Sequence, residues 1–261
     1  MFFIEMAFVV FLGLALGSFA TALSYRLPRE ISIVTRARSQ CPSCGHVLES
    51  ADLVPLFSWV FLRGKCRHCR AHIGMRYPLI ELATLALCLL FFFVYGLSAQ
   101  TIFVFALAPV LVAIIDIDLW HQIIPDSLNT AIAVIGIVVL AVNAGMAAHP
   151  VHFLMTRGIQ ACCGVLAYGG GAWLLRAAAG VILKREALGL GDVKFFAAAG
   201  FWLGLNAMEA SFLMIVSGGA GVILALLWKK RGDAAEVPFG PSLVIAFIFV
   251  LCLYRPALLG V

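Results

Sequence analysis

Long apolar runs separated by short polar segments make up most of the chain, and their lengths predict helices that cross a membrane. A helix needs roughly 20 apolar residues to span a bilayer. Eight runs have this character, at residues 2–23, 79–97, 101–119, 127–147, 158–182, 192–206, 210–228 and 239–259. The sixth run is the shortest and contains Gly200 and Gly204. The pattern predicts an all-α polytopic membrane protein with about eight transmembrane helices.

One long polar segment, residues 24–78, interrupts this pattern after the first run. It divides the chain into a first transmembrane helix (1–23), a cytoplasmic insert (24–78) and a seven-helix membrane domain (79–261). The first run carries Glu5 in place of a basic start and has no small-residue cleavage site, so we interpret it as a retained span. Composition supports a membrane location, since 63% of residues are apolar and 12% are charged, against about 25% charged in a soluble domain.

Lysine and arginine residues gather in three of the polar segments. Nine lie in residues 24–78, and further clusters lie at 184–194 and 229–231. Basic residues mark the cytoplasmic side of a membrane protein. With eight spans, all three segments fall on that side and both termini lie outside. The net charge of +5 reflects these loops, so no nucleic-acid partner is expected.

Four cysteines of the insert have the spacing of a structural zinc site. Cys41, Cys44, Cys66 and Cys69 form the pattern C-x2-C-x21-C-x2-C. Four thiolates complete a tetrahedral shell around one zinc ion. A polar segment of this size has too small a core to fold alone, and a metal compensates for that. A redox-active or solvated cysteine set is the alternative.

Two groups of acidic residues flank the membrane at the predicted cytoplasmic side. Asp118 lies near the end of the third run, and Asp192 opens the sixth. Charged residues at the edge of a span are rare and usually functional. Two adjacent carboxyl groups can activate one water, one as a base and the other as a proton donor. A helix cap or a solvated loop residue is the simpler interpretation of each acid alone.

Neighbouring residues give the acids context. Gly189 and Gly191 allow close backbone approach before Asp192, and Lys194 either supports the site or extends towards lipid headgroups. Asp116 is two residues from Asp118 and points elsewhere on a helix, so we regard it as a supporting acid. Asp126 follows Ile124-Pro125, a pattern typical of a helix-start cap.

The motifs occur in an order that resembles a known family. They are "GSF" (17–19), "YRLP" (25–28), the four cysteines, "SWVFLRGKCRHC" (58–69), "YPLIE" (77–81), "DLWHQIIPD" (118–126) and "GLGDVKFFAAAG" (189–200). Together they resemble type IV prepilin peptidases, which are membrane aspartyl proteases with a G-x-G-D motif.

The resemblance implies a bifunctional enzyme of the bacterial inner membrane that serves type IV pilus and type II secretion systems. It implies cleavage of the basic leader from prepilins or pseudopilins after a glycine, at the cytoplasmic face. It also implies methylation of the new N-terminal amine by S-adenosylmethionine. The catalytic acids fall on Asp118 and Asp192, and residues 79–261 become the peptidase domain. Trp120 and "DLVP" (52–55) depart from the family pattern.

The residues themselves do not identify methyl transfer, because no Rossmann-type G-x-G-x-x-G follows a strand. Glu81, Arg26 and Tyr77 are candidates for assisting it, with a cap or ion pair equally open for Glu81. Two other functions fit the acid pair and the cysteines: an ion-coupled transporter with a proton relay, and a non-enzymatic scaffold. A transporter more often places its acids at mid-bilayer or in inverted repeats.

Overall fold

The structure of the chain is a computed structural model. It describes residues 2–33, 38–99, 101–183, 188–205, 209, 212–213, 216–221, 223, 227 and 238–254. The described residues form helices and loops with no strand among them, apart from two isolated β-bridges in the insert. They group into two compact units, one of Met1–Leu97 with Phe105–Asp116, the other of Ser98–Val104 with Ile117–Val261.

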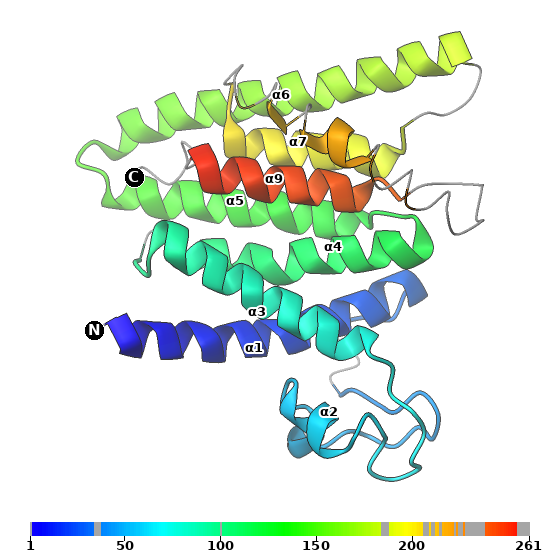
Figure 1. Cartoon of the computed structure of the whole chain (residues 1–261). Coiled ribbons are helices and arrows are strands. Elements are labelled where there is room, and N and C mark those ends of the chain that lie inside the picture. The colour runs from blue at the N-terminus through cyan, green and yellow to red at the C-terminus, as the bar shows by residue number, and fades with distance from the viewer. Residues whose placement is uncertain are drawn as a thin grey trace. The chain divides into compact units, whose positions relative to one another are not determined.

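The first unit is built on two helices that pack side by side, α1 (Phe2–Arg26) and α3 (Arg76–Tyr95) (Figure 1). Glycine allows their close approach, because a Cβ on Gly17 would lie 2.9 Å from the Cα of Glu81. The insert joins the two helices through the short helices η1 (Leu27–Arg29), η2 (Ser50–Asp52) and α2 (Phe57–Phe61). α3 ends at Gly96, whose positive φ terminates the helix.

The second unit contains α5 (Asp126–Met146), α6 (Pro150–Leu183), α7 (Leu190–Leu203) and α9 (Gly240–Tyr254). α7 packs against each of the other three (Figure 1). Its contact with α6 is a backbone contact, since a Cβ on Gly164 would collide with the carbonyl oxygen of Gly200. On the α5 side, Trp202 Nε1 donates a hydrogen bond to the carbonyl of Ile132 at 3.0 Å. α7 is thus fixed by small residues on one side and a buried hydrogen bond on the other.

One helix, α4 (Leu107–His121), follows the short helix η3 (Ile102–Ala106) and contributes to both units. Asp116 belongs to the first unit and Asp118 to the second. α4 ends before Gln122, which has a positive φ, and Pro125 then precedes α5.

Five helical segments are long and apolar enough to cross a membrane: Phe2–Arg29, Arg76–Tyr95, Ile102–His121, Asp126–Met146 and Pro150–Ile182. α9 is apolar but shorter. The predicted sixth span corresponds to α7, whose 14 residues extend about 21 Å at 1.5 Å per residue. Of the predicted seventh span (210–228), residues 210–211, 214–215, 222, 224–226 and 228 lie outside the described residues, as do 255–259 of the eighth. The structure supports a multi-spanning helical protein, whereas the number eight is not confirmed.

α6 differs most from its prediction, because it begins at Pro150 rather than at residue 158. Proline is favoured in the first turn of a helix, where its missing N–H is not needed. Large apolar side chains remain exposed along α6, including Leu166, Trp173 and Val181. Such a surface is expected where a helix faces lipid.

Candidate active site

Asp118 is a buried acid whose carboxylate meets the first residue of α9. Its Oδ2 accepts a hydrogen bond from the backbone N–H of Gly240 at 2.7 Å, and the residue is only 5% exposed. The N–H groups of a helix's first turn have no partner within the helix, and they favour a negative charge. A Cβ at position 240 would lie 2.8 Å from the same oxygen. The carboxylate can therefore reach this N–H only because residue 240 is glycine.

Asp192 is held at the start of α7 in a similar way. Its Oδ2 accepts the backbone N–H of Gly189 at 3.0 Å, so the side chain closes the first turn of its own helix. This is the capping role that the sequence left open, and it also fixes the direction of the carboxylate. Gly191, the residue before Asp192, lies close to the segment that precedes α5. A Cβ at position 191 would be 3.1 Å from the carbonyl oxygen of Ile124.

Two further side chains hold the segment before Asp192. Asn129 of α5 is buried and donates to the carbonyl of Gly191 at 3.1 Å. Arg176 of α6 donates to the carbonyl of Leu188 and attracts the Asp192 carboxylate electrostatically. The G-x-G-D segment is therefore tied to α5 and α6 by polar contacts.

Asp118 and Asp192 belong to the same unit, and the charge of Asp118 repels a negative charge on the carboxyl of Asp192. Two carboxyl groups that meet closely can share one proton. Such a pair can supply a base and an acid at once.

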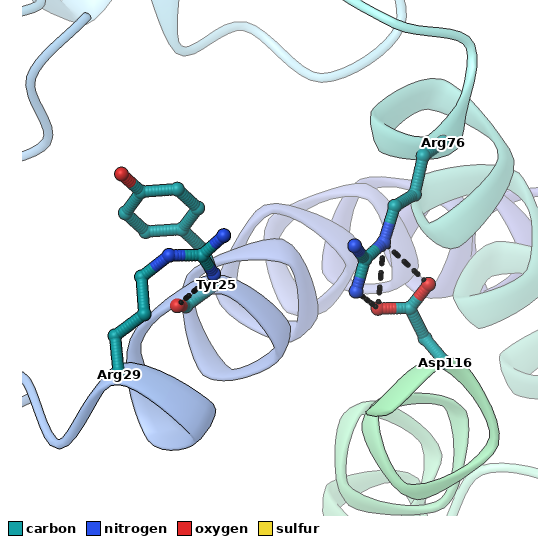
Figure 2. Close-up of polar contacts among 4 residues, drawn as sticks. All are labelled: Tyr25, Arg29, Arg76 and Asp116. Carbon is teal, nitrogen blue, oxygen red and sulfur yellow. Dashed lines mark hydrogen bonds and ion pairs between the residues drawn. The ribbon is translucent and has the colours of Figure 1, made fainter. Parts of the chain in front are cut away.

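The other acids of these segments have partners of their own. Asp116 forms a two-pronged ion pair with Arg76, with the Arg76 Nη2–Asp116 Oδ2 distance at 2.6 Å (Figure 2). Asp126 is the first residue of α5 rather than its cap, and its Oδ2 lies 2.6 Å from Lys194 Nζ. Lys194 thus bonds to a neighbouring helix, and this exposed pair links the starts of α5 and α7.

The four cysteines of the insert gather as their spacing predicts. The sulfur atoms of Cys41, Cys44, Cys66 and Cys69 all lie within 4.8 Å of one another, and those of Cys41 and Cys69 are 3.9 Å apart. Four sulfurs at about 2.3 Å from one zinc ion would be separated by roughly 3.8 Å. The arrangement is compatible with a tetrathiolate zinc site.

The two C-x2-C turns have the same backbone conformation, which explains why they can share one ion. In the first, Cys41 N–H bonds to the carbonyl of His46, and Gly45 N–H bonds to that of Cys41. The second repeats both bonds at Cys66 and Arg70. Gly45 and Arg70 both have positive φ, at 71° and 61°. Backbone N–H donors and neighbouring thiols outweigh burial and lower the pKa of Cys41 to about 7, which favours the thiolate that a metal needs.

A cavity of about 530 Å³ lies in the first unit between α1, the insert and the start of α3. Arg26, Tyr77 and Glu81, the three methyl-transfer candidates, all line it, as do Cys41 and Cys66. Glu81 accepts a hydrogen bond from the backbone N–H of Leu56 at 2.7 Å. Leu56 has a positive φ of 62°, so the insert adopts a strained turn where it meets this carboxylate.

Sequence reasoning missed Gly240, Asn129 and Arg176. For Arg176 a signal existed, because a charged residue inside an apolar run is unusual. Gly240 precedes Pro241 at the start of the last apolar run, which marks a helix start with free N–H groups but does not say what they bind. Asn129 carries no comparable signal.

Two parts of the chain match known protein families. Residues 11–95 match the Bacterial Peptidase A24 N-terminal domain, and residues 103–228 match the Type IV leader peptidase family. No solved structure matches the chain.

Similar proteins cover most of the chain. A Prepilin leader peptidase/N-methyltransferase of Burkholderia pseudomallei is 37% identical over 265 residues, covering 92% of this chain and 82% of that protein. The Type 4 prepilin-like proteins leader peptide-processing enzyme of Escherichia coli is 32% identical over 259 residues, covering 92% of this chain and 91% of that protein. With these similarities and the matches to both parts of the chain, the protein belongs to the type IV leader peptidase family.

Proposed function

We propose that the protein is a prepilin leader peptidase and N-methyltransferase of the bacterial inner membrane. It removes the basic leader from type IV prepilins or pseudopilins after a glycine and then methylates the new N-terminal amine. The names of its relatives support both reactions. The observation that carries the peptidase assignment is the pair Asp118 and Asp192, which lie in one unit and are each bonded to a backbone N–H near a helix start.

In the proposed cleavage, the pair carries one proton. The ionised carboxylate removes a proton from a water molecule, and the water oxygen attacks the carbonyl carbon of the scissile bond. The protonated carboxyl donates its proton to the carbonyl oxygen, so no oxyanion accumulates. The C–N bond then breaks, the nitrogen takes the proton from the carboxyl that acted as base, and the hydroxyl returns its proton to the pair.

Charge distribution supports a cytoplasmic location for this site. The basic segments 24–78, 184–194 and 229–231 mark one side of the membrane, and Asp192 lies within one of them. A basic leader reaches the carboxylates from that side, and the acids help to attract it.

Replacing each acid by its amide tests the peptidase assignment. We expect Asp118→Asn and Asp192→Asn each to lower cleavage of a prepilin-like peptide in detergent at least ~100-fold, the scale of acid–base catalysis. Asp126→Asn is the matched control, because Asp126 begins a neighbouring helix but is exposed and paired with Lys194. Wild-type cleavage rates in both Asp118→Asn and Asp192→Asn would refute the assignment.

We also propose that Cys41, Cys44, Cys66 and Cys69 bind one structural zinc ion that holds the two turns of the insert together. Purified protein should contain about one zinc per chain by elemental analysis. Cys41→Ser with Cys44→Ser should lose it, whereas Cys162→Ser with Cys163→Ser, an adjacent pair in α6, should keep it. A wild-type protein without zinc would contradict this assignment.

For methylation we propose S-adenosylmethionine as donor and Glu81, Arg26 and Tyr77 as the assisting residues. The donor supplies a methyl group attached to a positively charged sulfur. The amine nitrogen, once neutral, attacks the methyl carbon, and the electrons of the C–S bond go to sulfur. The Glu81 carboxylate can accept the proton that the amine loses, while Tyr77 and Arg26 can orient the peptide end. Glu81→Gln should lower methylation of an already cleaved peptide and leave cleavage unchanged.

A further inference from the structure

We propose that the cavity of the first unit binds the methyl donor, which is an adenosyl sulfonium compound with an amino-acid end. The inference rests on the methyl transfer proposed above and adds the place where it occurs. At about 530 Å³ the cavity is within the range of small-molecule sites, roughly 300–1,000 Å³.

The walls of the cavity match the donor's chemical groups. Tyr25, Trp59 and Tyr77 line the cavity with aromatic rings, and such rings can stack on a purine base and attract a sulfonium cation. One face of Tyr25 is already covered by Arg29, whose Cζ lies 4.2 Å from the ring centroid. Arg26 and Arg38 supply guanidinium groups. The donors of a guanidinium group form a planar fork, so arginine binds a carboxylate through two hydrogen bonds at once, which lysine does not.

The two carboxyl groups that line the cavity, those of Asp52 and Glu81, have different partners. Asp52 pairs with Arg67 at 2.7 Å, so its charge is already compensated. Glu81 instead accepts the N–H of Leu56, a neutral donor, so this contact does not compensate a charge on the carboxyl. When it is ionised, such a carboxylate favours the positive sulfonium donor over the neutral thioether that remains after transfer.

The cavity walls are held in place from both sides. Trp59 Nε1 donates to the carbonyl of Ile73 at 3.0 Å, and the Trp59 ring lies against Gly64, where a Cβ would be 2.9 Å away. The cysteine turns form another part of the wall through Cys41 and Cys66. Loss of the metal should therefore weaken binding of the methyl donor and also lower the stability of the insert.

Filling the cavity tests the assignment by direct binding. Ala22 of α1 lines the cavity, whereas Ala15 of the same helix is exposed and does not. In full-length protein, calorimetric titration should show that Ala22→Phe weakens binding of S-adenosylhomocysteine at least tenfold, while Ala15→Phe leaves it unchanged. Leader cleavage should persist in both variants. Ala22→Phe should also keep about one zinc per chain, which shows that the insert beside the cavity has folded.

A second measurement tests the charge of Glu81. Glu81→Gln keeps an acceptor for the Leu56 N–H but removes the negative charge. It should reduce the preference for S-adenosylmethionine over S-adenosylhomocysteine several-fold, whereas Glu30→Gln, at an exposed position, should not. A purely structural role for Glu81 would leave this preference unchanged.

The possible failures are distinguishable. If wild-type protein neither binds S-adenosylhomocysteine nor methylates a cleaved peptide, the proposed methyltransferase activity is wrong. If it does both and Ala22→Phe binds equally well, only the cavity assignment is wrong. Photolabelling of wild-type protein with radioactive S-adenosylmethionine gives an independent check. Label within residues 18–81 supports the cavity, and label confined to α5, α6, α7 or α9 overturns it.

Discussion

Asp118 and Asp192, the proposed catalytic acids, show how a backbone donor can fix the position of a side chain. Each carboxylate accepts an N–H from a glycine, Gly240 in one case and Gly189 in the other. The donors lie near helix starts, where unpaired N–H groups favour negative charge. The position of each acid therefore depends on a residue without a side chain.

Gly240→Ala should remove most of the peptidase activity. The new Cβ would lie 2.8 Å from Asp118 Oδ2, so the carboxylate must move. We expect cleavage of a prepilin-like peptide to fall at least ~100-fold, as for loss of the acid itself. Gly170→Ala is the control, because a Cβ there meets nothing within 4 Å. Full activity of Gly240→Ala would show that the Asp118–Gly240 contact has no catalytic importance.

Asp52 makes the stability of the insert depend on pH. The hydrogen bond from Arg67 holds the pKa of Asp52 below its usual range, against the effect of burial. A carboxyl whose pKa is lower in the folded state stabilises that state above the unfolded value of about 3.9, and the contribution is lost as pH falls through the folded-state pKa.

Asp52→Asn should accordingly lower the local stability of the insert at pH 7 by about 0.5–1 kcal/mol, discounted because half of the Arg67 side chain is exposed. Hydrogen exchange of the insert amides measures this difference. It should shrink as the pH is lowered to the point where Asp52 is protonated in the wild type. A difference that stays constant over that range would mean that the Arg67 pair is not its source.

At the scale of helices, α7 is positioned mainly by its contact with α6. Gly164 and Gly200 meet backbone to backbone, and a Cβ on Gly169 would lie 2.8 Å from the Cβ of Ala197. Small residues at such crossings allow helices in membranes to approach closely and gain van der Waals contact. Since Asp192 lies in the first turn of α7, this contact also places the acid.

Gly164→Leu should separate α6 from α7. Overpacking of this kind typically costs about 1–3 kcal/mol. We expect a lower melting temperature in detergent together with loss of cleavage. Gly158→Leu, on the same helix, adds a side chain where nothing lies within 4 Å and should change neither. Equal melting temperatures for the two variants would argue against a tight contact between the helices.

Local patterns predicted some elements well and others poorly. The cysteine turns could be predicted because four ligand residues and their spacing lie within one short segment. The start of α6 at Pro150 could not, because the apolar pattern strengthens only after Arg157. The ion pair of Arg76 with Asp116, 40 residues apart, depends on how two helices pack. The sequence around either residue does not predict it.

At the scale of the whole molecule, the two proposed activities lie in different units. The cysteine cluster and the cavity belong to the first unit, and Asp118 and Asp192 to the second. Sequence patterns alone predicted both groups of residues, but they did not indicate the cavity, because its walls come from three separate segments. α4 contributes an acid to each unit.

The predicted topology of eight spans can be tested in cells. An even number of spans places both termini on the side opposite the basic segments. Alkaline phosphatase fused after Val261 should therefore be active, and green fluorescent protein fused there should be dark. A reporter inserted after Glu49, in the basic insert, should give the opposite result. A fluorescent C-terminal fusion would require an odd number of spans.

The hydrogen bond between Asp118 and Gly240 joins positions 122 residues apart. Asp118 can therefore gain this donor only after the last helix has been synthesised. A chain still on the ribosome contains both acids long before its last helix emerges. Until then one acid lacks the donor that orients it. We expect newly made chains to have no peptidase activity until membrane insertion is nearly finished. Neighbouring membrane proteins are then protected from cleavage by an incompletely folded protease.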